Sequence, residues 1–152
     1  MIATQLPALQ VVVPLIAAPL CLLLSRRSIV WAVAFLASAA SFVVAVLLLV
    51  RVLEEDIVSY NFGGWAAPWG IEYRVDVVNA FVLIIVTAIS TLVLFFARQS
   101  VGQEVEGKKQ PLFYSAWLLC LTGLTGIAIT GDAFNLFVFL EKIGRASCRE
   151  RV

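Results

Sequence analysis

Glu141 is the residue of this chain whose type and position best suit chemistry. It follows an apolar stretch, residues 133–140, that comes directly after Asp132, a residue type suited to cap a helix start. Eight helical residues at ~1.5 Å each reach about 12 Å, so Glu141 is expected near the middle of a bilayer. A carboxylate at that depth is costly and by default marks an ion or proton path. We therefore predict that Glu141 is a proton carrier.

Two interpretations of Glu141 are open at this point. A carboxylate without water around it takes up a proton more readily, and the approach of a positive partner releases the proton again. On a helical period, Phe134, Phe137 and Val138 share the face of Glu141 and would supply apolar surroundings. The alternative is a carboxylate that pairs with a lysine and only holds two helices together.

The composition excludes an ordinary soluble domain. Of the 152 residues, 62% are hydrophobic and 14% are charged, whereas a soluble domain has roughly 25% charged residues. Four uncharged, mainly apolar stretches are long enough to cross a hydrocarbon core of ~30 Å. They are residues 6–24, 29–50, 77–96 and 112–130. We expect an all-α fold, a polytopic transmembrane helix bundle with four complete spans and the start of a fifth.

The first stretch is predicted to be a retained helix. A cleaved signal peptide carries positive charge before its apolar part, and no lysine or arginine precedes Arg26. Pro14 and Pro19 lie inside the stretch, which a membrane helix tolerates when its neighbours satisfy the freed carbonyl groups.

The distribution of basic residues predicts the orientation of the spans, because cytoplasmic loops retain lysine and arginine. The loops after the first and third spans hold five basic residues, and those after the second and fourth hold two. The five are Arg26, Arg27, Arg98, Lys108 and Lys109, and the two are Arg51 and Arg74. We therefore expect a multi-pass protein with its N-terminus outside.

Other residues that could carry chemistry have more ordinary interpretations. The fourth span is rich in small and hydroxyl residues, Thr122, Gly123, Thr125, Gly126 and Thr130. We expect these residues to serve close helix packing against a fifth helix after a turn at Gly131 and Asp132, with a hydroxyl-lined proton wire as the alternative.

The loop at residues 59–76 is predicted to anchor the protein at the membrane interface. Its aromatic residues are of the kind that favours the interface, and they are Tyr60, Trp65, Trp69 and Tyr73. Asp76 opens the third span and is predicted to cap it.

No metal or cofactor site is expected from the sequence. The chain has no histidine, and its three cysteines lack the spacing of a metal site. Cys21 and Cys120 lie within apolar stretches, where a thiol usually acts as a small buried hydrophobic group.

The last eleven residues differ abruptly from the rest. Residues 142–152 read KIGRASCRERV, with four basic residues and one acidic residue. A membrane helix continued through them would carry charges into hydrocarbon at ~2.5–3.5 kcal/mol each. The string is similar to the translation of a widely used sequencing-library adapter, so we exclude it from fold reasoning. The alternative is a genuine tail on a small structural membrane protein, with Glu141 at the interface.

Two motifs carry a resemblance to a known family. GGWAAPWGIEYRVD occupies residues 63–76, and TGDAFNLFVFLE occupies residues 130–141. They resemble the N-terminal part of the D subunit of Mrp-type monovalent cation/proton antiporters. That protein is similar to the antiporter-like subunits of NADH:quinone oxidoreductase and of membrane-bound hydrogenases. On this basis, residues 1–141 are expected to be the N-terminal transmembrane part of an antiporter subunit and residues 142–152 a translated adapter.

The resemblance implies a full subunit with inverted helix repeats. Glu141 matches the family's carboxylate on the fifth helix, which pairs with a lysine on a later helix. That lysine is not in this chain, so we expect the chain alone to be inactive.

The implied function is proton translocation through Glu141 in a sodium (monovalent cation)/proton antiporter, as a transporter subunit and not an enzyme. The alternative is a proton-pumping subunit of NADH:quinone oxidoreductase or a membrane-bound hydrogenase. No flavin, nicotinamide or iron–sulfur motif occurs, so no cofactor is expected. The expected partners are other antiporter subunits in a hetero-oligomeric membrane complex, the lipid bilayer, protons and monovalent cations, with no nucleic acid. The expected location is the bacterial plasma (inner) membrane.

Overall fold

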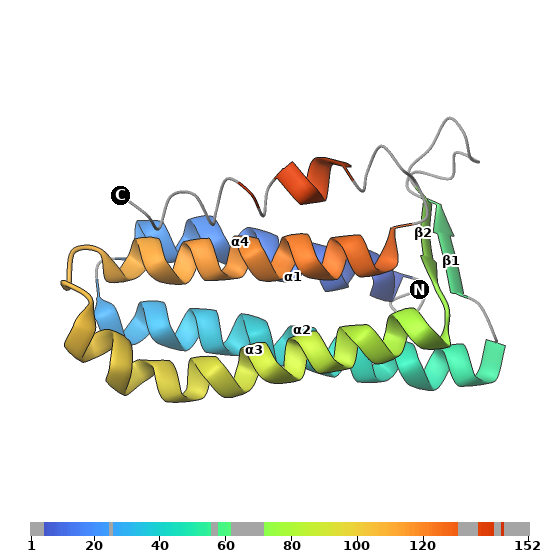
Figure 1. Ribbon diagram of the computed structural model, residues 1–152, viewed down its shortest axis with the longest axis horizontal. Helices are drawn as coiled ribbons and strands as arrows, with labels where there is room; N and C mark the ends of the chain where they lie inside the picture. Colours follow the sequence, from blue (N-terminus) through green and yellow to red (C-terminus); the bar gives the residue numbers. More distant parts are fainter. Residues whose placement is uncertain are drawn as a thin grey trace.

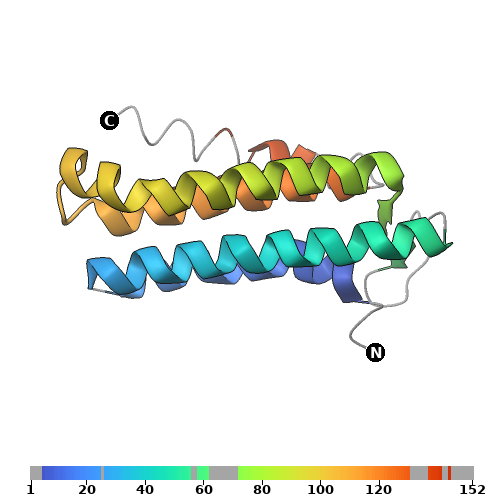
Figure 2. The same cartoon turned by 90° about the horizontal axis from the view of Figure 1, so that it is seen from below.

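The computed structural model describes residues 5–24, 26–55, 58–61, 72–130, 137–141 and 144. In this part of the chain, four long helices and a two-stranded hairpin follow one another in the order α1, α2, β1, β2, α3, α4. The helices lie side by side as an elongated bundle with the hairpin at one end (Figure 1 and Figure 2). Each of the four is long enough and apolar enough to cross a membrane. The predicted all-α membrane bundle is confirmed.

α1 (Leu6–Leu23) is continuous through two interior prolines. Pro7 lies in the first turn, where the missing N–H has no helical partner to lose. Pro14 and Pro19 lie further in, and each leaves the carbonyl group four residues earlier without its usual donor. For Pro14 that carbonyl belongs to Gln10, which lies on the buried side of the helix.

α2 (Arg27–Glu55) and α3 (Val77–Glu104) extend beyond the uncharged stretches that predicted them. The stretches at residues 29–50 and 77–96 mark the part of each helix that suits hydrocarbon. The backbone hydrogen bonds of a helix do not end at its first charged side chain, so both helices continue past the apolar window.

The start of α3 is capped as predicted. Oδ1 of Asp76 accepts a hydrogen bond from the backbone N–H of Asn79 at 2.8 Å, which satisfies one of the free donors of the first turn. The side-chain amide of Asn79 in turn donates to the carbonyl of Arg74 at 3.1 Å. The helix is thereby tied to the strand before it.

α4 (Gln110–Ile129) follows α3 after a short turn and runs back along the bundle (Figure 1). Pro111 lies in its first turn, where proline suits the helix start. The backbone N–H of Thr130 still bonds to the carbonyl of Gly126 at 3.1 Å, and Thr130 itself is extended.

A hairpin that the sequence did not predict joins α2 to α3. β1 (Val58–Asn61) pairs antiparallel with β2 (Glu72–Val75). Tyr73 of β2 also pairs with Thr130 as an isolated antiparallel bridge, so the hairpin is held to the end of α4.

Tyr73 differs from its prediction. It was expected among the interfacial aromatics, but its side chain is only 5% exposed and belongs to the core. The bridge to Thr130 places it between the hairpin and the helix ends, where the neighbouring elements cover it. Trp65 and Trp69, which were expected to anchor the same loop, lie outside the described residues.

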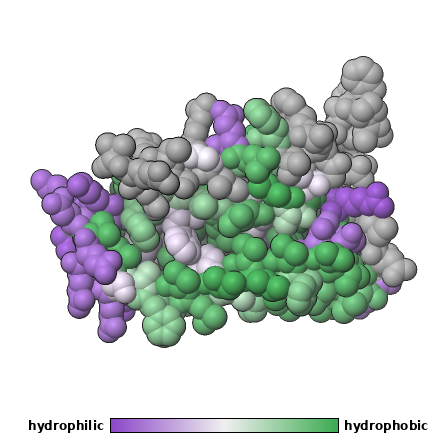
Figure 3. All heavy atoms as spheres, in the orientation of Figure 1, coloured by the Kyte–Doolittle hydropathy of each residue, from purple (hydrophilic) through white to green (hydrophobic). Residues whose placement is uncertain are grey.

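The bundle buries many small and polar residues together with some leucines, and it exposes many other large apolar side chains. α1 packs chiefly against α4 and α2, and α2 packs against α3. Many large side chains, Phe81 and Phe96 among them, face outward. They form a broad hydrophobic surface between two hydrophilic ends (Figure 3). This arrangement suits a protein whose outer surface meets lipid, where close helix packing by small residues replaces the hydrophobic effect as the main attraction.

The predicted fifth helix is described in part. Residues 137–141 are helical, as expected for the second half of the apolar stretch. The expected cap at Asp132 and the turn before it lie outside the described residues.

Candidate functional site

The short helical segment 137–141 lies beside α4, level with the half of α4 that leads to the hairpin (Figure 1 and Figure 2). Phe139 is 4% exposed, and its ring packs against Gly126 of α4. A Cβ atom at Gly126 would overlap that ring, so only a glycine permits this close approach. Gly126 is one of the small residues of the fourth span that were predicted to serve packing against a fifth helix, and this contact agrees with that prediction.

Glu141 ends the described part of this segment, and its side chain is exposed. Phe137 and Leu140 are exposed as well, at 65% and 52%. Glu141 and Phe137 therefore lie on the outward side of the segment, while Phe139 faces α4. The shared face of Phe134, Phe137, Val138 and Glu141 stays a prediction, and Phe134 lies outside the described residues.

The hydroxyl groups of α4 bond to their own helix. Oγ1 of Thr122 donates to the carbonyl of Leu118 at 2.8 Å, and Oγ1 of Thr125 donates to the carbonyl of Leu121 at 2.9 Å. Both side chains are fully buried. A hydroxyl bonded back to its own helix needs no partner across the interface, so these threonines serve packing between helices.

A second group of hydroxyls, which the sequence analysis missed, does cross between helices. Oγ of Ser38 in α2 donates to Oγ of Ser90 in α3 at 3.0 Å and lies 3.1 Å from Oγ1 of Thr91. Nε1 of Trp117 in α4 donates to the same Ser90 oxygen at 3.0 Å. Three helices are thus joined through one serine in the interior of the bundle.

The spacing of these hydroxyl residues could have identified them. Thr87, Ser90 and Thr91 follow the i, i+3, i+4 pattern of one helix face within an otherwise apolar span, and Ser38 and Ser41 are three residues apart. A polar stripe of this kind in a membrane helix predicts an interface with another helix.

A cavity of about 280 Å³ opens beside this network between α3 and α4. Ser90 and Trp117 contribute to its wall together with apolar side chains and Cys120. The polar groups of Ser90 and Trp117 are engaged with each other, so the cavity offers a largely apolar surface.

Gln10 is a further buried polar residue that the sequence analysis missed. Its side chain has no exposed surface, and neither Oε1 nor Nε2 has a hydrogen-bond partner in the described part of the chain. A sequence pattern could have identified Gln10. It is a polar residue within an apolar span, and it lies four positions before an interior proline.

The described residues include no group of three or more cysteine, aspartate or glutamate side chains that could hold a metal ion. Cys21 is fully buried, with its Sγ 3.9 Å from the carbonyl of Val30. It behaves as the small buried residue that was predicted.

These features define a multi-pass membrane protein, and comparison with known proteins narrows the class. The chain is 35% identical over 143 residues to the N subunit of NADH-quinone oxidoreductase from Desulforudis audaxviator, covering 90% of this chain and 28% of that protein. It is 29% identical over 140 residues to the D subunit of a Na(+)/H(+) antiporter from Bacillus subtilis, covering 91% of this chain and 28% of that protein. No family model matches the chain.

Two solved structures share the fold. A chain of the membrane-bound sulfane sulfur reductase, an archaeal respiratory membrane complex, matches with a TM-score of 0.84 at 28% identity over 93% of this chain and 29% of its own. A chain of the Mrp complex from Dietzia sp. DQ12-45-1b matches with a TM-score of 0.83 at 27% identity over 97% of this chain and 27% of its own.

The chain belongs to the family that comprises the D subunits of Mrp-type antiporters and the antiporter-like subunits of NADH-quinone oxidoreductase. It spans 28% of the length of the first two relatives described above.

Proposed function

We propose that this chain is the N-terminal transmembrane part of a membrane subunit of a multi-subunit Na+/H+ antiporter, and that Glu141 carries protons through that subunit. The observation that carries the proposal is the similarity of 91% of the chain to the D subunit of a Na(+)/H(+) antiporter, together with the shared fold of a chain in an Mrp complex.

The role of Glu141 in this proposal has three supports. The stretches 6–24, 29–50, 77–96 and 112–130 contain no acidic or basic residue, so they offer no competing proton carrier. The segment that ends in Glu141 lies against α4 through the Phe139–Gly126 contact. Glu141 and Phe137 also lie on the outward side of the segment, turned away from the four helices, where a helix bearing a cation would meet Glu141.

The test compares carboxylate variants in the full-length subunit within its complex. Everted membrane vesicles are energised, and the collapse of the pH gradient on addition of Na+ is followed with a fluorescent probe. Glu141→Gln is expected to lower this antiport by at least about a hundredfold, because an amide cannot give up a proton, in keeping with the ~10²–10⁴-fold worth of a positioned acid or base. Glu141→Asp is expected to retain part of the activity.

Glu104→Gln is the matched control, because Glu104 is an exposed carboxylate at the end of α3. It should leave antiport unchanged. Full activity of Glu141→Gln in a correctly assembled complex would exclude the proton-carrying role and leave a structural carboxylate.

The position of Glu141 can be tested through Gly126. Gly126→Leu would displace the Phe139 ring and with it the segment that carries Glu141. We expect a shift in the pH dependence of antiport, which a variant that merely lowers the amount of complex would not produce. Reducing the ring with Phe139→Ala in the Gly126→Leu background should restore part of the wild-type profile.

The second candidate function is proton pumping within a redox complex. It is favoured by the 35% identity to a protein of NADH-quinone oxidoreductase and by the fold match to an archaeal respiratory complex. The two candidates differ in their driving force. Proton uptake that follows electron transfer to quinone and is indifferent to Na+ would support the redox complex, whereas a response to Na+ without electron transfer supports the antiporter.

We further propose that the N-terminus lies outside and that the end bearing Arg26 and Lys108 is cytoplasmic. Gln103→Cys at this end and Arg74→Cys at the hairpin introduce exposed thiols at opposite ends of the bundle. A membrane-impermeant maleimide added to intact cells should label the second variant and not the first. The reverse labelling would invert the topology.

For residues 142–152, we propose a translated adapter in place of native protein sequence. Genomic DNA read across codon 141 with primers outside the suspected adapter should continue as an apolar helix. A genome that encodes KIGRASCRERV followed by a stop would overturn this and favour a small structural membrane protein.

A further inference from the structure

A second cavity, of about 230 Å³, lies at the end of the bundle opposite the hairpin. The start of α2, the end of α3 and the start of α4 meet there. It is lined by Arg27, Ser28, Trp31, Arg98, Gly102, Gln110 and Tyr114. Two of these side chains are guanidinium groups, and none is acidic.

Each arginine is held in place by uncharged neighbours. The guanidinium of Arg98 lies over the ring of Trp31, 4.9 Å from its centroid. Trp31 is itself fixed, because its Nε1 donates to the carbonyl of Leu94 at 2.8 Å. The guanidinium of Arg27 packs over Gly107, where a Cβ atom would overlap it. Neither arginine forms an ion pair with a carboxylate in the described part of the chain.

The charge at this end of the bundle is unbalanced. The described basic residues here are Arg26, Arg27, Arg98, Lys108 and Lys109, and the described acidic residues are Glu104 and Glu106. Glu106 is engaged with Lys109 at 3.6 Å, away from the cavity wall. The cavity thus holds two positive charges that no described acidic side chain neutralises.

The position of the cavity along the bundle, relative to the bilayer, indicates what kind of anion would enter it. Its lining residues belong to the end of the bundle opposite the hairpin. The ends of the bundle are hydrophilic and border a broad hydrophobic surface (Figure 3). Trp31 and Tyr114 contribute to its wall, and both residue types favour the boundary between acyl chains and headgroups. Basic cavities between membrane helices at this level suit the phosphate of a lipid headgroup.

We infer that this cavity binds the phosphodiester headgroup of an anionic phospholipid. Arg27 and Arg98 contact the phosphate oxygens, and the Ser28 hydroxyl and the start of α2 provide further donors. Arginine suits this task because its planar fork of N–H groups matches two phosphate oxygens at once. The acyl chains lie along the exposed apolar surface of the bundle.

The first experiment measures lipid binding to the full-length subunit in its assembled complex. The delipidated complex is titrated with dioleoylphosphatidylglycerol or dioleoylphosphatidylcholine, and bound lipid is counted by native mass spectrometry. Wild type is expected to prefer the anionic lipid at one high-affinity site. The double variant Arg27→Gln with Arg98→Gln should weaken that site by about tenfold or more, since it removes the charge-assisted hydrogen bonds to the phosphate, each worth about tenfold.

Arg26→Gln with Lys108→Gln is the matched control, because it removes two charges from the same end without touching the cavity wall. It should change the affinity by less than about threefold, since exposed charges outside the cavity are screened by salt. An equal effect of both double variants would show general surface attraction and overturn the proposed site.

A steric variant keeps both charges and fills the cavity. Gly102 lies in its wall, and a Cβ atom there would meet nothing within 4 Å. Gly102→Leu introduces a good helix former whose Cβ atom meets no neighbour, and it should abolish high-affinity lipid binding in a complex that remains folded. Retained binding in this variant would place the lipid elsewhere.

Two further outcomes would also overturn the inference. Inorganic phosphate that displaces the lipid at equal concentration would assign the site to a free anion. Loss of a neighbouring subunit from the double arginine variant, with lipid binding unchanged, would assign the arginines to a protein carboxylate.

Discussion

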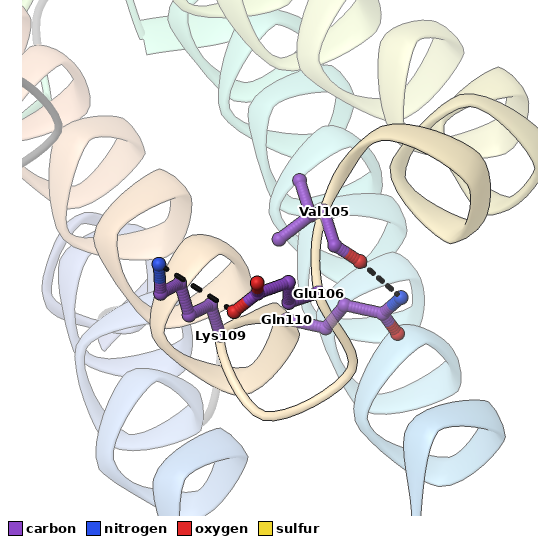
Figure 4. Close-up of polar contacts among 4 residues, drawn as sticks. All are labelled: Val105, Glu106, Lys109 and Gln110. Carbon is purple, nitrogen blue, oxygen red and sulfur yellow. Dashed lines mark hydrogen bonds and ion pairs between the residues drawn. The ribbon is translucent and has the colours of Figure 1, made fainter.

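The first half of α1 and the turn between α3 and α4 each bury a glutamine, but only the second glutamine is hydrogen-bonded among the described residues. Gln10 has no exposed surface and no hydrogen-bond partner in the described part of the chain. Gln110 is 4% exposed, and its Nε2 donates to the carbonyls of Val101 and Val105 at 3.3 and 3.1 Å. Figure 4 shows the second of these bonds beside the Glu106–Lys109 ion pair.

The difference depends on whether backbone carbonyl groups near each glutamine are free to accept a hydrogen bond. The carbonyl of Val105, at the C-cap of α3, lies where a helix leaves acceptors without an intrahelical donor, and the amide of Gln110 supplies one. The carbonyl of Val101 accepts from the same amide and from the backbone N–H of Val105. The side chain of Gln10 is buried within the bundle, away from a helix end, and neither of its polar atoms has a hydrogen-bond partner in the described part of the chain. A buried amide therefore stabilises a helix end, whereas within a helix bundle its burial costs free energy.

The largest effect is expected at Gln110. Gln110→Met keeps the approximate size of the side chain and removes both donors, so the free energy of unfolding should fall by about 2 kcal/mol. Denaturant titration of the full-length subunit in mixed micelles measures the change. Gln103→Met, at an exposed position of α3, is the control and should be nearly neutral. A neutral Gln110→Met would remove the distinction between the two glutamines.

Gln10→Met should act in the opposite direction and raise the free energy of unfolding by about 1 kcal/mol. The substitution removes an amide whose burial without a partner is costly and retains an apolar stem of similar length. The same titration measures it. A loss of stability would contradict the comparison, because it would show that Gln10 has a bonding partner in the assembled protein.

Buried serine and threonine hydroxyls allow a similar comparison, between a hydrogen bond that crosses two helices and one that stays within a helix. A double-mutant cycle of Ser38→Ala and Ser90→Ala should give a coupling energy of ~0.6 kcal/mol, the usual value for hydrogen bonds between membrane helices. A cycle of Ser38→Ala and Thr122→Val should give none, since Thr122 bonds to its own helix. Equal coupling in both cycles would show that the crossing bond has no special role.

The smallest effect is expected at the ion pair beside Gln110. Glu106 and Lys109 lie 3.6 Å apart with side chains 77% and 69% exposed, and water and salt screen such pairs. Glu106→Gln should lower the free energy of unfolding by ~0.3 kcal/mol at low salt and by less at high salt. A larger loss would mean that the ion pair, and not Gln110, stabilises the turn.

Much of the fold could be predicted because its signals are local. The spans follow from the length of uncharged apolar stretches, and the cap at Asp76 follows from a carboxylate that precedes a helix. The Phe139–Gly126 contact agrees with the expectation that small residues on the fourth span let a fifth helix approach. The orientation and the role of Glu141 stay predictions.

The hairpin and the burial of Tyr73 could not be predicted. A two-stranded pairing depends on which backbone lies opposite, and Tyr73 is covered because Thr130 pairs with it from the end of a distant helix. Interfacial preference is a property of the residue type, whereas exposure at one position depends on its neighbours.

The sequence by itself determined that the chain crosses a membrane several times, and it identified Glu141 as an ionisable residue on the fifth apolar stretch. Hydropathy and helix capping act over a few residues, so they can be read along the chain. Only the tertiary structure decided which polar residues meet. It joined Ser38, Ser90 and Trp117 and brought Arg27 and Arg98 to one cavity. Among the described residues, it gave hydrogen-bond partners to Gln110 and none to Gln10. The physical reason is that a helical period tells which residues share a face and carries no information on which helix that face will meet.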